Sequence, residues 1–82
     1  MINIKTFAQV REVTQEAGFS LPLEKANSTV ADVKVTLRMR APCWGEALDD
    51  GVLCAVNQVL CDDSHPVAEG DEVAFFPPVT GG

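Results

Sequence analysis

Alternation of apolar and polar residues predicts that strands make up much of this chain. The expected strands cover residues 2–7, 19–24, 52–56, 59–61 and 72–76. In the first, Ile2 and Ile4 alternate with polar residues, which leaves one face of the strand apolar. Because Pro22 lacks a backbone N–H, the second strand is expected at an edge of the sheet, paired with the first. Asn57 and Gln58 are expected to form the two-residue turn between the third and fourth strands.

The first predicted helix covers residues 8–17. Val10, Val13 and Ala17 recur at a helical spacing, so they share one face of that helix. Gly18 follows where a C-terminal cap belongs. A helix is therefore expected between the first two strands.

Residues 28–40 fit two patterns. Thr29 followed by Asp32 resembles a capping box, although Glu or Gln is more usual at the second position. Helical spacing links Val30, Val33 and Leu37. From residue 33 to residue 39, however, apolar and polar residues also alternate as in a strand. Periodicity alone leaves both structures open.

Residues 41–50 are expected to be a connection, with Pro42 as a breaker of regular structure and with Trp44 and Leu48 anchoring the segment in the core. The expected order is then strand, helix, edge strand, helix, two short strands and a final strand. This order indicates an α+β fold in which one mixed sheet carries helices packed on one face.

Length, composition and charge exclude several classes of protein. The 82 residues suffice for one domain, and a hydrophobic content of 46% is typical of a globular chain. The net charge of −6 repels phosphate backbones, which argues against nucleic-acid binding. The same charge either steers a basic partner or only keeps the chain soluble. No apolar stretch approaches the roughly 20 residues that span a membrane. With no signal peptide recognised, a cytoplasmic protein is expected.

The three cysteines lack the spacing of a zinc site and are odd in number. The predicted hairpin makes Cys54 and Cys61 neighbours on adjacent strands. A disulfide between them is conceivable, but two free buried thiols are favoured in a cytosolic protein. Nothing adjacent in sequence would activate Cys43, and His65 has no partner in sequence, so neither is assigned a role.

The C-terminus carries the candidate chemistry. Residues 1–76 are interpreted as the domain and residues 77–82 as an extended tail. Pro77 and Pro78 stiffen the exit, and the tail reaches about 20 Å at roughly 3.3–3.6 Å per residue. Gly81 and Gly82 give its end a minimal cross-section that suits a narrow channel. The reactive group is then the Gly82 carboxylate, which is a poor electrophile until it is activated, for example as an acyl-adenylate.

The end of the chain resembles the sulfur carrier subunit of molybdopterin synthase, the MoaD type within the ThiS/MoaD ubiquitin-like family. The resemblance is most specific in Phe-Phe-Pro-Pro-Val-Thr-Gly-Gly, preceded by Gly-Asp-Glu-Val-Ala. Further similar segments are residues 7–12, 29–30 and 55–58. The resemblance implies the ubiquitin-like β-grasp fold, and it favours a helix from Thr29 to about Arg40.

The resemblance also implies a reaction cycle in molybdenum cofactor biosynthesis. An ATP-dependent adenylating enzyme of the MoeB type activates Gly82, and a persulfide source supplies the sulfur. The thiocarboxylated tail enters the large, MoaE-type subunit of a heterotetrameric synthase and donates sulfur to cyclic pyranopterin monophosphate. The chain is then a co-substrate and not catalytic alone. It is expected to bind no cofactor or metal, and the partner enzyme uses the ATP.

Alternation along the first and last strands indicates a docking face. Val73 and Phe75 are expected to face the core, which leaves Phe7 and Phe76 outward, where aromatic residues suit a protein interface. The resemblance completes the partner-binding set, which is Phe7, Arg11, Leu60 and Phe76. In the alternative, a helix or the proline segment covers both phenylalanines.

Two other functions remain open. Carriers for thiazole synthesis and small protein modifiers also end in Gly-Gly on this fold, although the Phe-Phe-Pro-Pro segment points away from them. A ubiquitin-like interaction domain without carrier chemistry is the second alternative. Intact mass after incubation with an adenylating enzyme, ATP and a sulfur source separates a carrier from such a domain.

Overall fold

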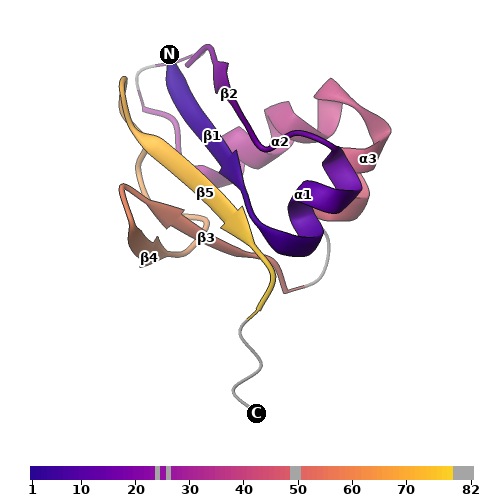
Figure 1. Ribbon diagram of the computed structural model, residues 1–82. Helices are drawn as coiled ribbons and strands as arrows, with labels where there is room; N and C mark the ends of the chain where they lie inside the picture. The colour runs from indigo at the N-terminus through magenta and orange to yellow at the C-terminus, as the bar shows by residue number, and fades with distance from the viewer. Residues whose placement is uncertain (24, 26, 49–50, 79–82) are drawn as a thin grey trace.

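The computed structural model describes residues 1–23, 25, 27–48 and 51–78. Its elements are β1 (Ile2–Thr6), α1 (Ala8–Thr14), β2 (Gly18–Leu21), α2 (Val30–Arg40), α3 (Pro42–Ala47), β3 (Leu53–Val56), β4 (Val59–Cys61) and β5 (Glu72–Phe76). The strands form one sheet in the order β2-β1-β5-β3-β4. Figure 1 shows the three helices on one side of this sheet. The predicted α+β fold, a mixed sheet with helices packed on one face, is confirmed.

The centre of the sheet is the parallel pair of β1 and β5, and the other neighbouring strands are antiparallel. β2 is an edge strand paired with β1, as predicted, although Pro22 follows the strand instead of interrupting it. The β3–β4 hairpin turns at Asn57 and Gln58, whose φ angles of 51° and 70° lie in the left-handed region. Such angles at both central residues are typical of the tight hairpin turn predicted here.

The core lies between the sheet and the helices. Ile4, Val73 and Phe75 are completely buried on the helix-facing side of β1 and β5. Leu37 of α2 and Trp44 of α3 meet them from the other layer and are also completely buried. Alternation along the strands therefore assigned the inward face correctly.

Residues 30–40 form a helix, which decides between the two patterns in that segment. Its first turn carries the predicted capping box, in which the Asp32 carboxylate accepts from the Thr29 N–H at 2.9 Å. The N–H groups of the first two helical residues donate to carbonyl groups of the loop at residues 63–65, each at 3.0 Å. These bonds satisfy donors that a helix start otherwise leaves free. Val35 and Met39, inward on the strand pattern, are 54% and 82% exposed.

The prediction of a first helix ending at Ala17 is wrong, since α1 ends at Thr14. Gln15 adopts a left-handed φ of 62°, and the chain turns there towards β2. The backbone N–H of Thr6 donates to the Ala17 carbonyl at 3.1 Å, which holds the segment against β1. Gly18 accordingly begins β2 and does not cap the helix.

The prediction of an irregular connection over residues 41–50 is also wrong, because α3 forms within it. Pro42 occupies the first helical position, where its missing N–H has no intrahelical partner to lose. Trp44 and Leu48, 0% and 4% exposed, are confirmed as core anchors.

Glu16, in the segment between α1 and β2, connects this segment to α2 and α3. Its carboxylate accepts two hydrogen bonds from Arg40 at the end of α2, at 3.1 and 2.8 Å, and one from the Trp44 indole N–H at 3.1 Å. The Arg40 guanidinium also lies 4.1 Å from the centre of the Phe19 ring. The hydrogen bonds from Arg40, and then from Trp44, hold the pKa of Glu16 below its ordinary value.

Candidate functional site

The surface of the sheet opposite the helices carries an apolar patch, which we call the outer apolar face. The pairing of neighbouring strands brings its residues together. Lys5, Ala74, Ala55 and Leu60 follow one another across β1, β5, β3 and β4, and Phe76 pairs with Leu53 in the next row. The N–H of Phe7 donates to the Phe75 carbonyl at 3.1 Å, which extends the alternation of β1 by one residue. The face consists of Phe7, Leu53, Ala55, Leu60, Ala74 and Phe76.

Two alanines form the floor of this face, and larger side chains stand around them. Ala55 and Ala74 are only 8% and 6% exposed, whereas Phe7 and Leu60 are 48% and 63% exposed. Phe76 is half-buried at the end of β5. Such a flat apolar floor with projecting aromatic and aliphatic groups is the surface chemistry of a protein interface.

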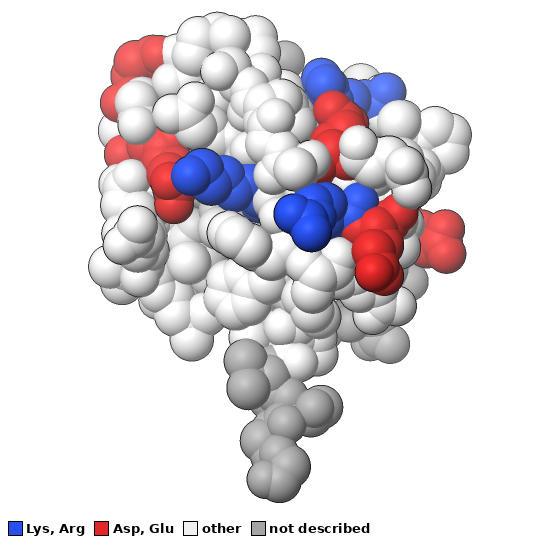
Figure 2. All heavy atoms as spheres, in the orientation of Figure 1, with Lys and Arg blue, Asp and Glu red and all other residues white. Residues whose placement is uncertain are grey.

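The other end of the same sheet surface is polar. Lys5 and Glu72 form an ion pair at 3.3 Å, and the Ser20 hydroxyl donates to the Asn3 side-chain oxygen at 3.3 Å. In Figure 2, charged side chains cross the middle and upper parts of the view, while its lower part is uncharged. The apolar residues therefore lie at the end of the sheet where β5 finishes.

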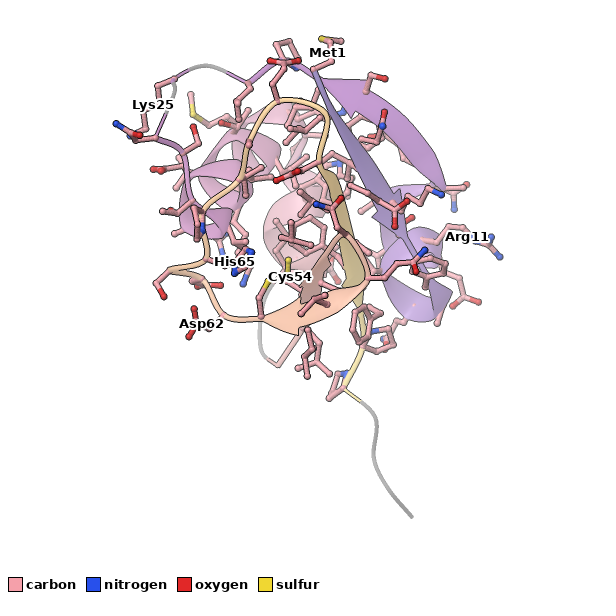
Figure 3. All side chains as sticks on the ribbon, turned by 90° about the vertical axis from the view of Figure 1, so that its left-hand side faces the viewer. Met1, Arg11, Lys25, Cys54, Asp62 and His65 are labelled. Carbon is pink, nitrogen blue, oxygen red and sulfur yellow. The ribbon has the colours of Figure 1, made fainter. Side chains whose placement is uncertain are left out.

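Of the four predicted partner-binding residues, the sheet brings together Phe7, Leu60 and Phe76. The alternative in which a helix or the proline segment covers both phenylalanines is not what the structure shows, because all three helices lie on the opposite side and Phe7 stays 48% exposed. Arg11 lies on α1, one helical turn after Phe7, and Figure 3 shows its side chain extending into solvent. Among the described residues no carboxylate forms an ion pair with it.

The predicted partner-binding set does not include Leu53 and Ala55. The signal for them was present, because a turn at residues 57–58 and an inward Cys54 place residues 53 and 55 on the outer side of β3. Only the pairing of β3 with β5 puts them beside Phe76, and a sequence does not reveal that long-range pairing.

The chain leaves the sheet over a small cavity. Pro77 and Pro78 directly follow β5 and line a cavity of about 170 Å³. The other residues around it come from α1, from α3 and from the position just before β3, and are Gln9, Val10, Val13, Glu46, Ala47 and Val52. Gly51, with a φ of 83°, approaches Pro78 so closely that a Cβ there would lie 3.7 Å from the proline ring. The two prolines therefore pack against the domain in a defined position.

The predicted reactive residues, Gly81 and Gly82, lie outside the described residues. So does the remainder of the predicted tail after Pro78. The structure thus defines the point from which the tail departs, beside the outer apolar face.

The cysteines are free thiols, as the sequence favoured. Cys54 and Cys61 are register partners, which confirms their predicted placement. Burial, followed by the charge of Cys61 and a hydrogen bond with it, raises the pKa of the Cys54 thiol to about 12. Cys43 is half-buried on α3.

The described part of the chain offers neither a cluster of metal-ligating side chains nor a helix able to span a membrane. No group of three His, Cys, Asp or Glu side chains is arranged there to hold a metal ion. None of the helices found there combines the length and the apolar character needed to cross a membrane. A second cavity, of about 190 Å³, lies between β2 and α2, and its carboxylate, Asp32, caps α2.

Similarity to known proteins agrees with this geometry. The ThiS family matches residues 4–82, which is nearly the whole chain and includes the Gly-Gly end. The chain belongs to the ThiS family. The resemblance drawn from residues 70–82 and the internal segments is therefore confirmed.

Among ThiS-family relatives, the molybdopterin synthase sulfur carrier subunit of Escherichia coli (strain K12) is 43% identical over 83 residues, with both chains covered in full. The crystal structure of the small archaeal modifier protein SAMP1 from Haloferax volcanii superposes with a TM-score of 0.83 at 27% identity, covering 99% of this chain and 98% of the other. The complex of subunits 1 and 2 of molybdopterin-converting factor from Helicobacter pylori contains a chain that is 26% identical, with a TM-score of 0.69 and coverages of 99% and 97%.

Proposed function

We propose that this chain is the sulfur carrier subunit of a molybdopterin synthase and acts in molybdenum cofactor biosynthesis. The observation that carries the proposal is the 43% identity to the Escherichia coli sulfur carrier subunit, which extends over the full length of both chains. Because the reaction uses ATP, the proposed place of action is the cytoplasm.

In this proposal the reacting group is the C-terminal carboxylate of Gly82. The ionised carboxylate is a poor electrophile, so an ATP-dependent adenylating enzyme of the MoeB type first converts it to an acyl-adenylate, with release of pyrophosphate. The terminal sulfur of a persulfide then displaces AMP to form an acyl disulfide, and a thiol cleaves its S–S bond, which releases the thiocarboxylate and leaves the thiol in a disulfide. The thiocarboxylate sulfur attacks cyclic pyranopterin monophosphate, and water then cleaves the acyl–sulfur bond, which leaves the sulfur on the pterin and regenerates the carboxylate. The chain contributes no general base to this cycle, and the large subunit surrounds the transfer.

The outer apolar face is the proposed binding surface for the large synthase subunit. The Helicobacter pylori complex supports a partner of this kind, since it pairs the two subunits of a molybdopterin-converting factor. Burying Phe7, Leu60 and Phe76 against a partner removes exposed apolar area from water, which stabilises the complex. Arg11 is proposed as a polar contact at the margin of this surface.

The position of the face relative to β5 supports the proposal as well. Phe76 is the last residue of β5, and only six residues separate it from the chain end at Gly82. Gly81 and Gly82 have no side chain beyond hydrogen, so they suit a narrow channel in the partner. A partner held on the outer apolar face is therefore within reach of the reactive carboxylate.

The test is intact-mass measurement after incubation with the adenylating enzyme, ATP and a persulfide source. The expected result is a mass gain equal to the replacement of one oxygen atom by sulfur, located at Gly82. A variant lacking Gly82 serves as the control. It is expected to keep the wild-type melting temperature, because terminal residues contribute little to a core, and to gain no sulfur. Synthase activity retained by that variant would contradict the proposal.

Protein modification is a second candidate, favoured by the likeness to the small archaeal modifier protein. A modifier forms an isopeptide bond between its C-terminal carbonyl and a lysine of a target, whereas a carrier is recovered as the free chain. Affinity purification of the tagged chain distinguishes them. Recovery of a large synthase subunit without covalent conjugates supports the carrier.

A further inference from the structure

Cys54 and Cys61 form a pair of thiols across the β3–β4 hairpin. They are register partners, on the side of the sheet that faces the helices. The Cys61 thiol donates to the Cys54 carbonyl oxygen at 3.7 Å. Directly opposed residues in antiparallel strands have Cα atoms about 4.5–5.5 Å apart. A disulfide needs a Cα separation of about 4.4–6.8 Å, so the backbone already meets this requirement.

The two thiols differ in access. Cys54 is 3% exposed and belongs to the hydrophobic core, whereas Cys61 lies on edge strand β4 and is only partly buried. Figure 3 shows Cys54 between β3 and the segment that carries Asp62 and His65. A reagent from solvent therefore reaches Cys61 first. The raised pKa of Cys54 keeps it protonated, which suppresses direct attack by that thiol on an external reagent.

Charges near the pair act in opposite directions. The ammonium group of Lys34 on α2 favours the thiolate of Cys54, whereas the carboxylate of Asp63, its ion-pair partner at 2.7 Å, disfavours it. Burial outweighs both charges, so Cys54 loses its proton only when it attacks a mixed disulfide held beside it on Cys61. The pair thus combines an accessible attacking thiol with a buried resolving thiol.

We propose that Cys54 and Cys61 are a redox-active dithiol, which low-molecular-weight disulfides such as oxidised glutathione convert reversibly to a cross-strand disulfide. The Cys61 thiolate attacks one sulfur of the reagent, forms a mixed disulfide and releases one thiol. Cys54 then loses its proton and attacks the Cys61 sulfur, which releases the second thiol. Two protein thiols are oxidised and one reagent disulfide is reduced to two thiols.

This modification site is independent of the proposed sulfur-carrier function, but it is coupled in structure to the outer apolar face. Leu60 directly precedes Cys61 and points to the opposite side of β4. A covalent bond between β3 and β4 restrains the edge strand that carries Leu60. Oxidation should therefore restrict the position of Leu60 at one margin of the proposed docking surface.

The experiment treats the full-length reduced protein with oxidised glutathione at neutral pH and measures intact mass without reducing agent. The expected product has lost the mass of two hydrogen atoms, maps to a peptide linking Cys54 with Cys61, and reverts on addition of dithiothreitol. Cys43→Ser is the matched control and should give the same product. Cys54→Ala, which keeps the core apolar, should stop at a glutathione adduct on Cys61.

Cys61→Ser should leave Cys54 unmodified, because the buried thiol then has no accessible partner. A wild-type protein that remains fully reduced overturns the proposal. So does a stable glutathione adduct on Cys61 that never closes to a disulfide, or a linkage that involves Cys43. Circular dichroism of each variant establishes that a negative result comes from a folded protein.

Discussion

Phe75 and Phe76 are neighbours in sequence on opposite sides of the sheet, and truncating each should affect a different property. Phe75 is 0% exposed, so Phe75→Ala leaves a cavity in the core and should lower the free energy of unfolding by roughly 3–5 kcal/mol. The total free energy of unfolding of a domain this size is about 5–15 kcal/mol. The loss should therefore be visible as a large fall in melting temperature.

Phe76→Ala should act on binding instead. The half-buried Phe76 side chain lies on the outer apolar face, so its truncation should change the free energy of unfolding by less than about 1 kcal/mol. Loss of a central interface aromatic weakens binding by about 2 kcal/mol or more. That corresponds to roughly a 30-fold increase in the Kd for the large synthase subunit. Phe7→Ala, on the same outer apolar face, should behave in the same way.

The assay pairs isothermal titration calorimetry against the large subunit with urea unfolding of the free variants. Val35→Ala is the matched control, because Val35 is 54% exposed on α2, on the other side of the molecule. It should change neither Kd nor stability appreciably. If Phe76→Ala unfolds the domain while Phe75→Ala only weakens the complex, the assignment of faces on β5 is inverted. If neither variant weakens binding, the partner uses a different surface.

Two further predictions concern the tail and pH. Gly81→Val should fold normally but be adenylated and thiocarboxylated slowly, because a β-branched residue widens the tail and restricts its backbone. Single-turnover assays measure both rates. Rates equal to those of the wild-type protein would show that no narrow channel is involved. Glu16→Gln should lower the free energy of unfolding at neutral pH by about 1 kcal/mol, the size typical of a partly exposed ion pair. Since Arg40 lowers the folded-state pKa of Glu16, this stabilisation is complete above the ordinary value of 4.5 and is lost as the pH falls through the lowered pKa. Urea unfolding of both proteins at neutral and acidic pH should show their difference shrinking below 4.5, and a constant difference would contradict the assignment.

The strands were the most predictable part of the fold, because their signal is local. Phe75 and Phe76 show this alternation in adjacent positions, since Phe75 lies in the core and Phe76 points outward. The ends of α1 were less predictable. Ala17 continues the helical spacing of Val10, yet Gln15 adopts a left-handed φ and the helix stops at Thr14. The Ala17 carbonyl then accepts from Thr6 on the preceding strand, a contact that no sequence window around Ala17 contains.

The helix α3 was missed for a different reason. Pro42 was interpreted as a breaker, although a proline at the first helical position is compatible with a helix start. The six residues of α3 are too few to show a clear period. Packing of Trp44 into the core, and its hydrogen bond to Glu16, stabilise a helix that its own sequence barely indicates.

For the candidate site, alternation along the strands alone placed Phe7 and Phe76 outward, while the resemblance to the family supplied Leu60 and Arg11. Sequence reasoning could not supply Leu53, because that residue reaches Phe76 only through the antiparallel pairing of β3 with β5. The sheet order therefore determines which outward residues become neighbours.

The position of β5 has a mechanical consequence. β5 pairs with β1 on one side and with β3 on the other, and the residues leading to Gly82 continue directly from its end. A partner that grips the tail and pulls along it loads both ladders of hydrogen bonds in shear, so that many bonds must break together. If the proposed cycle holds, the domain therefore resists unfolding when it is withdrawn from a partner by its C-terminal end.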